Sequence, residues 1–142
     1  PTQVLWRGVD GALISRNRSD CSSFITALWR RAYGYDPNEM RQWLGVSAPR
    51  AIDYHFAIVD GNRFQRIGRM IDLQPGDLLA TRYQRSRPGA TGHVMVAAAR
   101  PTAGFTQPAG CGGATHASRI PASPPHGEAT DWLAALENWH AH

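Results

Sequence analysis

The stretch Asp20-Cys21-Ser22-Ser23-Phe24, which opens an apolar run that stops at Gly34, decides how the chain is expected to fold. Asp20 is a favoured N-cap residue, and the serines suit the first turn of a helix. Gly34 is the residue type expected just after a helix end. The sequence therefore predicts a helix over Cys21–Tyr33. The apolar residues of this run recur at helical spacing: Phe24, Ile25, Ala27, Leu28, Trp29 and Ala32.

The predicted helix places Cys21 in its first turn. A helix N-terminus carries a partial positive charge and unpaired N–H groups, and both stabilise a thiolate. The pKa of a cysteine there can fall from its ordinary value of about 8.5 toward the range in which the side chain is nucleophilic at neutral pH. Cys21 is therefore a candidate nucleophile. The alternative is a small buried apolar residue at a helix start, because free cysteine is among the most buried residue types.

Two later segments predict strands. Leu73-Gln74-Pro75-Gly76-Asp77 is a turn signal followed by apolar residues, so a strand is expected within 72–81. Gly92-His93 opens another apolar run, which predicts a buried strand over 93–99. A histidine at the mouth of such a strand is held rigidly, and its imidazole can take the proton of a helix-start thiol. The alternative for His93 is an ordinary loop or edge residue.

In order along the chain, these three blocks resemble those of the NlpC-type cell-wall peptidases, which belong to the papain-like cysteine hydrolases. The family pattern is an Asp-Cys-Ser-x-Phe helix start, a Leu-x-Pro-Gly-Asp-Leu strand and a His-Val strand. The resemblance covers residues 19–99. It implies that Cys21 is the nucleophile, that His93 is the general base, and that peptide or amide bonds of peptidoglycan stem peptides are the substrate. It also implies an α+β, papain-like fold with the cysteine helix packed on a small antiparallel sheet.

The resemblance is incomplete at the third catalytic position. The family usually places a polar residue on the strand after the histidine strand, where it orients the imidazole. Here the corresponding stretch is rich in Gly, Ala and Pro. His116 is the first candidate for this position, with Gln107 and His126 as the others. The alternative for His116 is a solvated loop residue.

The implied reaction is amide hydrolysis through a thioester acyl-enzyme, with no cofactor. Cys21 attacks the carbonyl carbon, and its own backbone N–H helps to bind the oxyanion. His93 takes the thiol proton and returns it to the leaving amine. Two alternatives from other classes stay open. One is a catalytically degenerate wall-binding or effector module on the same fold, and the other is a basic partner-binding domain whose binding weakens with salt.

Length and charge are consistent with a small hydrolase. The 142 residues, 42% of them hydrophobic, predict one domain over 1–142 with a partly irregular tail over 101–142. Fifteen Lys+Arg against 11 Asp+Glu give a net charge of +4, which suits an anionic partner such as the bacterial wall. Nucleic acid is not expected, since no sequence signature of a nucleic-acid-binding module is visible. Arg82, Arg85 and Arg87 are expected in a basic loop that joins the two predicted strands and borders the active-site cleft.

The cysteines and histidines of the sequence predict neither a disulfide nor a metal site. A disulfide between Cys21 and Cys111 would consume the nucleophile, and a free thiol is preferred because nothing else suggests a disulfide-rich fold. Cys111, His116 and His126 lack a compact four-ligand spacing, so no metal site is expected. The longest apolar run, 94–99, is far short of the roughly 20 residues of a membrane helix. The sequence shows no leader and no initial methionine. The chain is therefore expected to be a mature or excised piece of an envelope or secreted bacterial protein. The sequence does not predict its oligomeric state.

The remaining segments carry weaker signals. Pro37–Leu44 predicts a second helix, with Asp36 as N-cap and Pro37 at the first helical position. Residues 52–59 fit either a strand or a helix edge. Residues 1–17 are expected to be an entry segment that packs Val4-Leu5-Trp6 on the core, and 101–125 to be irregular. Residues 130–140 predict a terminal amphipathic helix with four apolar residues in the core: Trp132, Leu133, Leu136 and Trp139.

Overall fold

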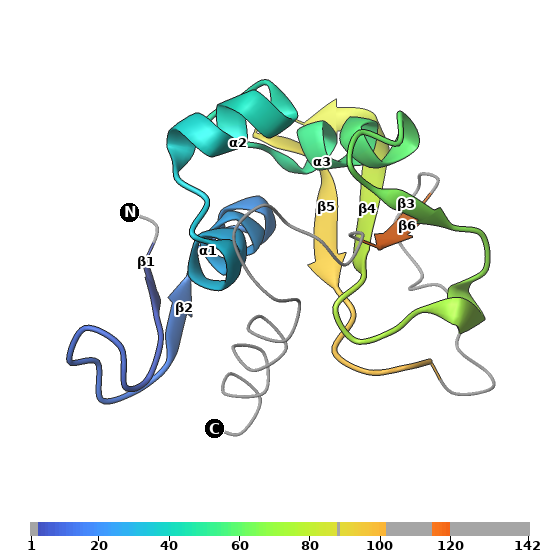
Figure 1. Cartoon of the computed structure of the whole chain (residues 1–142). Helices are drawn as coiled ribbons and strands as arrows, with labels where there is room; N and C mark the ends of the chain where they lie inside the picture. Colours follow the sequence, from blue (N-terminus) through green and yellow to red (C-terminus); the bar gives the residue numbers. More distant parts are fainter. Residues whose placement is uncertain (1–2, 88, 102–114, 120–142) are drawn as a thin grey trace.

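The computed structural model describes residues 3–87, 89–101 and 115–119 of the 142. This part of the chain forms a small mixed α/β domain with two antiparallel sheets (Figure 1). The elements follow one another as β1 (Gln3–Leu5), β2 (Arg16–Arg18), α1 (Cys21–Tyr33), α2 (Pro37–Leu44), α3 (Ala51–Val59), β3 (Gln65–Ile67), a 3-10 turn (Met70–Asp72), β4 (Leu78–Arg87), β5 (Ala90–Val96) and β6 (Thr115–Arg119). No described helix is both long and apolar enough to cross a membrane.

The larger sheet has the strand order β3-β6-β4-β5, and every neighbouring pair is antiparallel. Within the described part of the chain, β5 is therefore an edge strand. Helix α3 contacts all four of these strands, whereas α1 lies beside β5 (Figure 1). The smaller sheet is the antiparallel hairpin β1–β2. The expectation of a cysteine helix next to a small antiparallel sheet is confirmed at this level of detail.

Helices α1 and α2 begin and end where the sequence predicts, because both are capped. The Asp20 carboxylate accepts the backbone N–H of Ser23 at 2.8 Å, and Gly34 closes α1 in the left-handed conformation with φ 69°. Asp36 and Glu39 form a reciprocal capping box at the start of α2. These contacts satisfy backbone groups that a helix end otherwise leaves without a partner.

One core cluster joins the three helices to one face of the larger sheet. Ile25 and Leu28 of α1 are almost fully buried in it, and β4 and β5 contribute Ala80 and Val94. Full burial of such a side chain is worth about 1.5–3 kcal/mol. The rings of Trp29 and Trp43 meet edge to face, with centroids 4.9 Å apart, which ties α1 to α2. A smaller cluster lies around Leu73, Leu79 and Met95.

Several elements differ from the sequence expectation. Residues 52–59 belong to a helix, and the buried positions Ala51, Tyr54, His55 and Ile58 of α3 have helical spacing. The prediction that Arg82, Arg85 and Arg87 lie in a loop is wrong, because they lie within the ten-residue strand β4. There the burial alternates from Thr81 to Gln84 as in a strand, and after a register shift beyond Arg82 the hairpin pairs again at Arg87.

The strand limits shift accordingly. The strand expected over 72–81 begins only at Leu78, because the preceding residues form the 3-10 turn and the tight turn before β4. The strand expected over 93–99 spans Ala90–Val96 instead. The hairpin β1–β2 and strands β3 and β6 were not predicted, and β6 lies inside the segment expected to be irregular. The expected terminal helix over 130–140 lies outside the described residues.

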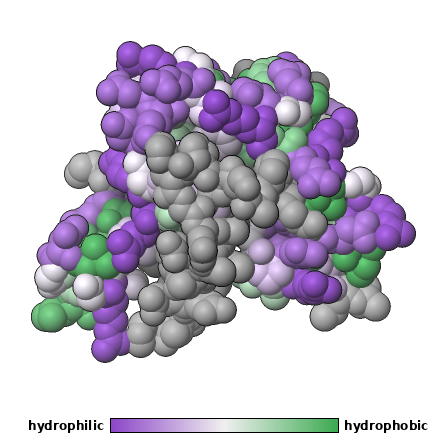
Figure 2. Space-filling view, viewed as in Figure 1, coloured by the Kyte–Doolittle hydropathy of each residue, from purple (hydrophilic) through white to green (hydrophobic). Residues whose placement is uncertain are grey.

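The entry segment packs as predicted through Trp6, which contacts the main core cluster and has its ring 6.2 Å from that of Phe24. The connection between β1 and β2 instead exposes Leu13 and Ile14. The described surface visible in Figure 2 is largely hydrophilic, with apolar patches at the β1–β2 end.

A partly buried hydroxyl pair links α1 to α3. The Thr26 hydroxyl donates to the Ser22 carbonyl at 2.8 Å and lies 2.9 Å from the Tyr54 hydroxyl. Because a threonine hydroxyl has a single proton, Tyr54 is the donor to Thr26. Burial raises the pKa of Tyr54, so this phenol keeps its proton at any ordinary pH.

The substitution Tyr54→Phe is expected to lower the free energy of unfolding by about 1 kcal/mol, because it removes the hydrogen bond to Thr26 and leaves the ring in place. Urea unfolding followed by circular dichroism measures the change. Tyr35→Phe is the matched control, since Tyr35 is also buried but its hydroxyl has no hydrogen-bond partner among the described residues. Equal losses for both variants would contradict the importance of the Thr26–Tyr54 contact.

Candidate functional site

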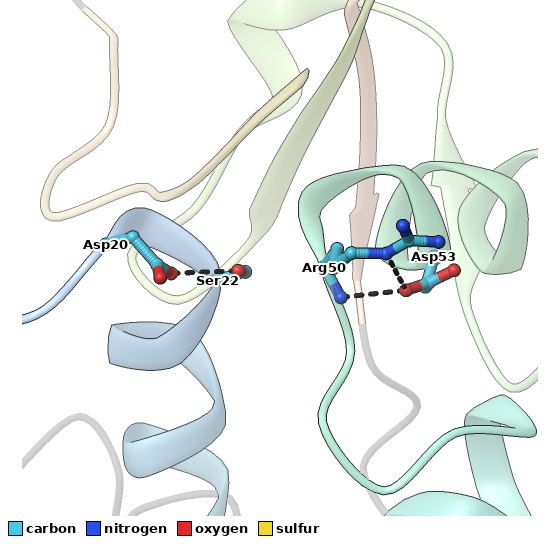
Figure 3. A network of polar contacts seen from close by, with 4 residues as sticks. All are labelled: Asp20, Ser22, Arg50 and Asp53. Atoms are coloured by element: carbon cyan, nitrogen blue, oxygen red, sulfur yellow. Dashed lines mark hydrogen bonds and ion pairs between the residues drawn. The ribbon is translucent and has the colours of Figure 1, made fainter. Parts of the chain in front are cut away.

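Cys21 is the first residue of α1, and its thiol is half-buried and free. The side chain packs against the main core cluster, on the side of α1 that faces the sheet. Asp20 directs its carboxylate to the serines: Oδ1 accepts from the Ser22 hydroxyl at 2.9 Å (Figure 3), and Oδ2 accepts from the Ser23 hydroxyl at 3.1 Å. The helix start therefore presents the thiol at the positive end of the α1 dipole.

His93 lies on β5, where it is half-buried and paired in register with Thr81 of β4. Its neighbours in sequence on β5 belong to different clusters. Val94 and Val96 pack in the main cluster with α1, whereas Met95 packs with Leu79 in the smaller cluster. Since side chains alternate along a strand, His93 shares the face of Met95.

The structure thus brings the two elements together but leaves the two side chains apart. Helix α1 contacts β5, yet no hydrogen bond joins the Cys21 thiol to the His93 imidazole in the described part of the chain. The sequence alone could not reveal this, because it does not specify which face of the strand packs on α1.

The structure explains why the residue directly before His93 is a glycine, Gly92. A Cβ atom at this position would collide with the carbonyl oxygen of Thr81 on the neighbouring strand. Glycine therefore allows β4 and β5 to approach closely at the point where β5 presents His93.

The turn formed by Leu73-Gln74-Pro75-Gly76-Asp77 is hydrogen-bonded to the chain at the C-terminal end of β5. The Asp77 carboxylate accepts the backbone N–H of Gln74 at 2.7 Å, which closes the turn. Gly76 donates to the Ala97 carbonyl at 2.7 Å, and Ala97 donates to the Asp77 carbonyl at 2.8 Å. Asp77 is nearly fully buried. The second sequence block therefore fixes the strand that carries His93.

His116 lies on β6, the neighbour of β4 on the side away from β5. Its backbone pairs with Ala80, whereas Thr81, the partner of His93, pairs with Thr115. The register thus aligns Thr115 with His93, and the orienting role of His116 stays a prediction. Gln107, Cys111 and His126 lie outside the described residues.

A cleft of about 760 Å³ runs along the side of α1 that lies opposite Cys21. At 100° per residue, Ser22, Thr26 and Arg30 lie on a side of the helix away from Cys21 and Leu28. The cleft is lined by the former three residues and not by Cys21 or His93.

Sequence reasoning missed His55, which is buried on α3 with its ring 5.5 Å from that of Phe56. The helical spacing of Ala51, Tyr54, His55 and Ile58 was the signal that could have placed it on the core face. Among the described residues, no group of three His, Cys, Asp or Glu side chains is arranged to hold a metal ion.

Comparison with known proteins finds a significant relative. The chain is similar to the uncharacterized protein R653 of Acanthamoeba polyphaga mimivirus, with 33% identity over 95 residues. The match takes in 66% of this chain and 42% of the viral protein, so the chain spans less than half the length of that relative. No protein-family model matches the chain, and no solved structure matches it significantly.

The N-cap of α1 gives a pH-dependent contribution to stability. The backbone N–H of Ser23 is the main cause that lowers the pKa of Asp20 below its ordinary value of 3.8. A carboxylate with a lowered pKa in the folded state stabilises the fold above its unfolded pKa, and this contribution disappears as the pH falls through the folded pKa. Asp20→Ala is therefore expected to cost about 1 kcal/mol of unfolding free energy at pH 7, and less below about pH 4.

Urea unfolding of wild type and Asp20→Ala between pH 2 and pH 7 measures this difference. Asp60→Ala is the control, because Asp60 is an exposed carboxylate that caps no helix N-terminus. A difference between wild type and Asp20→Ala that stays constant over the whole range would show that the Asp20 charge plays no part.

Proposed function

We propose that this protein is a cysteine hydrolase of peptide or amide bonds, with Cys21 as the nucleophile and His93 as the proton carrier. The carrying observation is a free, half-buried thiol in the first turn of α1, a helix that contacts the strand bearing His93. The fold proposed with it is papain-like, since a cysteine helix beside an antiparallel sheet is what the three-block resemblance implies.

The proposed reaction has two half-reactions. The Cys21 thiolate attacks the substrate carbonyl carbon, the C–N bond breaks, and the protonated His93 gives its proton to the leaving amine. Water then attacks the thioester, His93 takes a proton from that water, and the thiolate leaves to restore the enzyme. The backbone N–H of Cys21 has no acceptor within α1, so it is available to the oxyanion.

The proton transfers require the imidazole to approach the thiol. His93 is half-buried on β5, which is an edge strand of the described sheet. Catalytic hydrogen bonds are often long in the free enzyme and tighten only when substrate binds. The proposal therefore assigns the Cys21–His93 contact to the substrate complex.

Peptidoglycan stem peptides are the proposed substrate, and the bacterial envelope or the exterior is the proposed location. The three ordered blocks support this choice, and a net charge of +4 favours an anionic wall.

A second candidate is a catalytically degenerate binding module on the same fold. It is favoured by the alternation along β5, because His93 shares the face of Met95 while Cys21 packs in the main cluster. The two candidates differ in whether bonds are cleaved.

Wild-type protein is expected to release peptide fragments from purified bacterial sacculi, as detected by mass spectrometry. Cys21→Ala and His93→Ala are each expected to abolish release, and His116→Ala to weaken it. Because the dyad acts as a unit, the double variant Cys21→Ala/His93→Ala should be no worse than either single variant.

Cys111→Ser is the matched cysteine control and should keep full activity. Full activity of Cys21→Ala would rule out cysteine catalysis. A folded wild type that cleaves none of several wall chemotypes but still binds sacculi would favour the binding module.

A further inference from the structure

The cleft on the far side of α1 has a floor built from two stripes of that helix. Ser22, Thr26 and Arg30 form one stripe, and Ser23, Ala27 and Arg31 form the other, each at a spacing of four residues. From Ser22 to Arg31 the helix rises about 14 Å, at 1.5 Å per residue. The cleft is therefore elongated along a helix that carries Cys21 on its opposite side.

Two segments from elsewhere in the chain form the walls. The first contains β1 and the residues after it, and it contributes the half-buried Val4, Trp6 and Val9 together with the exposed Gln3 and Asp10. The second leads into α3 and contributes Ser47, Pro49 and Arg50. The first wall thus combines apolar side chains with one carboxylate, whereas the second wall ends in a cation.

Three arginines and two carboxylates line this cleft, and two of the arginines have no neutralising partner among the described residues. Arg30 and Arg31 are exposed and form no ion pair with any described residue. Arg50 pairs with Asp53 at 3.4 Å, but its side chain remains 67% exposed (Figure 3). The Asp20 carboxylate at the other end already accepts from Ser22 and Ser23, so it is not aimed at the arginines.

We propose that this cleft binds an acidic peptide in an extended conformation, with peptide carboxylates on Arg30 and Arg31. A length of about 14 Å accommodates about four extended residues at 3.3–3.6 Å each. The cleft volume of about 760 Å³ is within the range of ligand sites in proteins. Guanidinium groups bind carboxylates with two parallel hydrogen bonds, and Trp6 and Val4 offer apolar contacts to alternate side chains. The site does not depend on the proposed hydrolase, because Cys21 lies on the other side of α1.

A fluorescein-labelled pentapeptide of alternating Glu and Leu tests the proposal by fluorescence anisotropy. The double variant Arg30→Ala/Arg31→Ala is expected to raise Kd by about tenfold or more, since it removes two charge-assisted contacts. The matched control is Arg16→Ala/Arg18→Ala, which removes the same charge from exposed residues of β2 outside the cleft. Cys21→Ala should bind as the wild type does.

Three outcomes would overturn the proposal. The first is an equal loss in the control variant, which would mean general attraction to a basic protein. The second is equally tight binding of a peptide with Gln in place of Glu. The third is no binding to wild type at millimolar peptide, which would leave the arginines with only their favourable position at the C-terminal end of α1. If the alanine variant fails to fold, Arg30→Lys/Arg31→Lys keeps the helix-end charge and should still weaken binding, because lysine loses the bidentate geometry.

Discussion

The packing of α1 through one apolar face is the constraint on which the rest of the structure depends. Ile25, Leu28 and Trp29 bury that face against the other helices and the sheet. Because the apolar face of α1 is packed in the core, the opposite face of the helix points away from the core. That opposite face forms the floor of the cleft. The same packing places the Cys21 side chain against the main core cluster and the Arg30 side chain in the cleft.

The second sequence block has a structural meaning that complements this packing. Asp77 closes its own turn, and the exchange of backbone hydrogen bonds with Ala97 holds the end of β5. Gly92 lets the other end of β5 approach β4 closely. The first block therefore caps a helix, the second forms a turn that is hydrogen-bonded to the end of β5, and the third allows two paired strands to approach closely. Together they place the helix that carries Cys21 beside the strand that carries His93.

Local rules were sufficient wherever a side chain caps its own helix. Asp20, Gly34 and Asp36 determine the ends of α1 and α2 through contacts within a few residues, so the sequence alone predicted both helices. Strand limits failed because pairing depends on distant partners: β4 continues through a basic stretch because β5 pairs with it up to Arg82 and, after a register shift, again at Arg87. The same limit applies to the site. Cys21 could be placed by its position in a helix, whereas the face of β5 on which His93 lies follows from the packing of Val94 and Val96 on α1.

The central proposal is that Cys21 is an activated nucleophile assisted by His93, and the rate of its alkylation tests this most directly. Iodoacetamide labelling of Cys21 at neutral pH, resolved from Cys111 by peptide mapping, is measured in wild type and in His93→Ala. The account predicts that Cys21 is labelled faster than Cys111 in wild type, and that its labelling slows when the imidazole is removed. An inert Cys21 in the folded protein, with labelling only at Cys111, would contradict it.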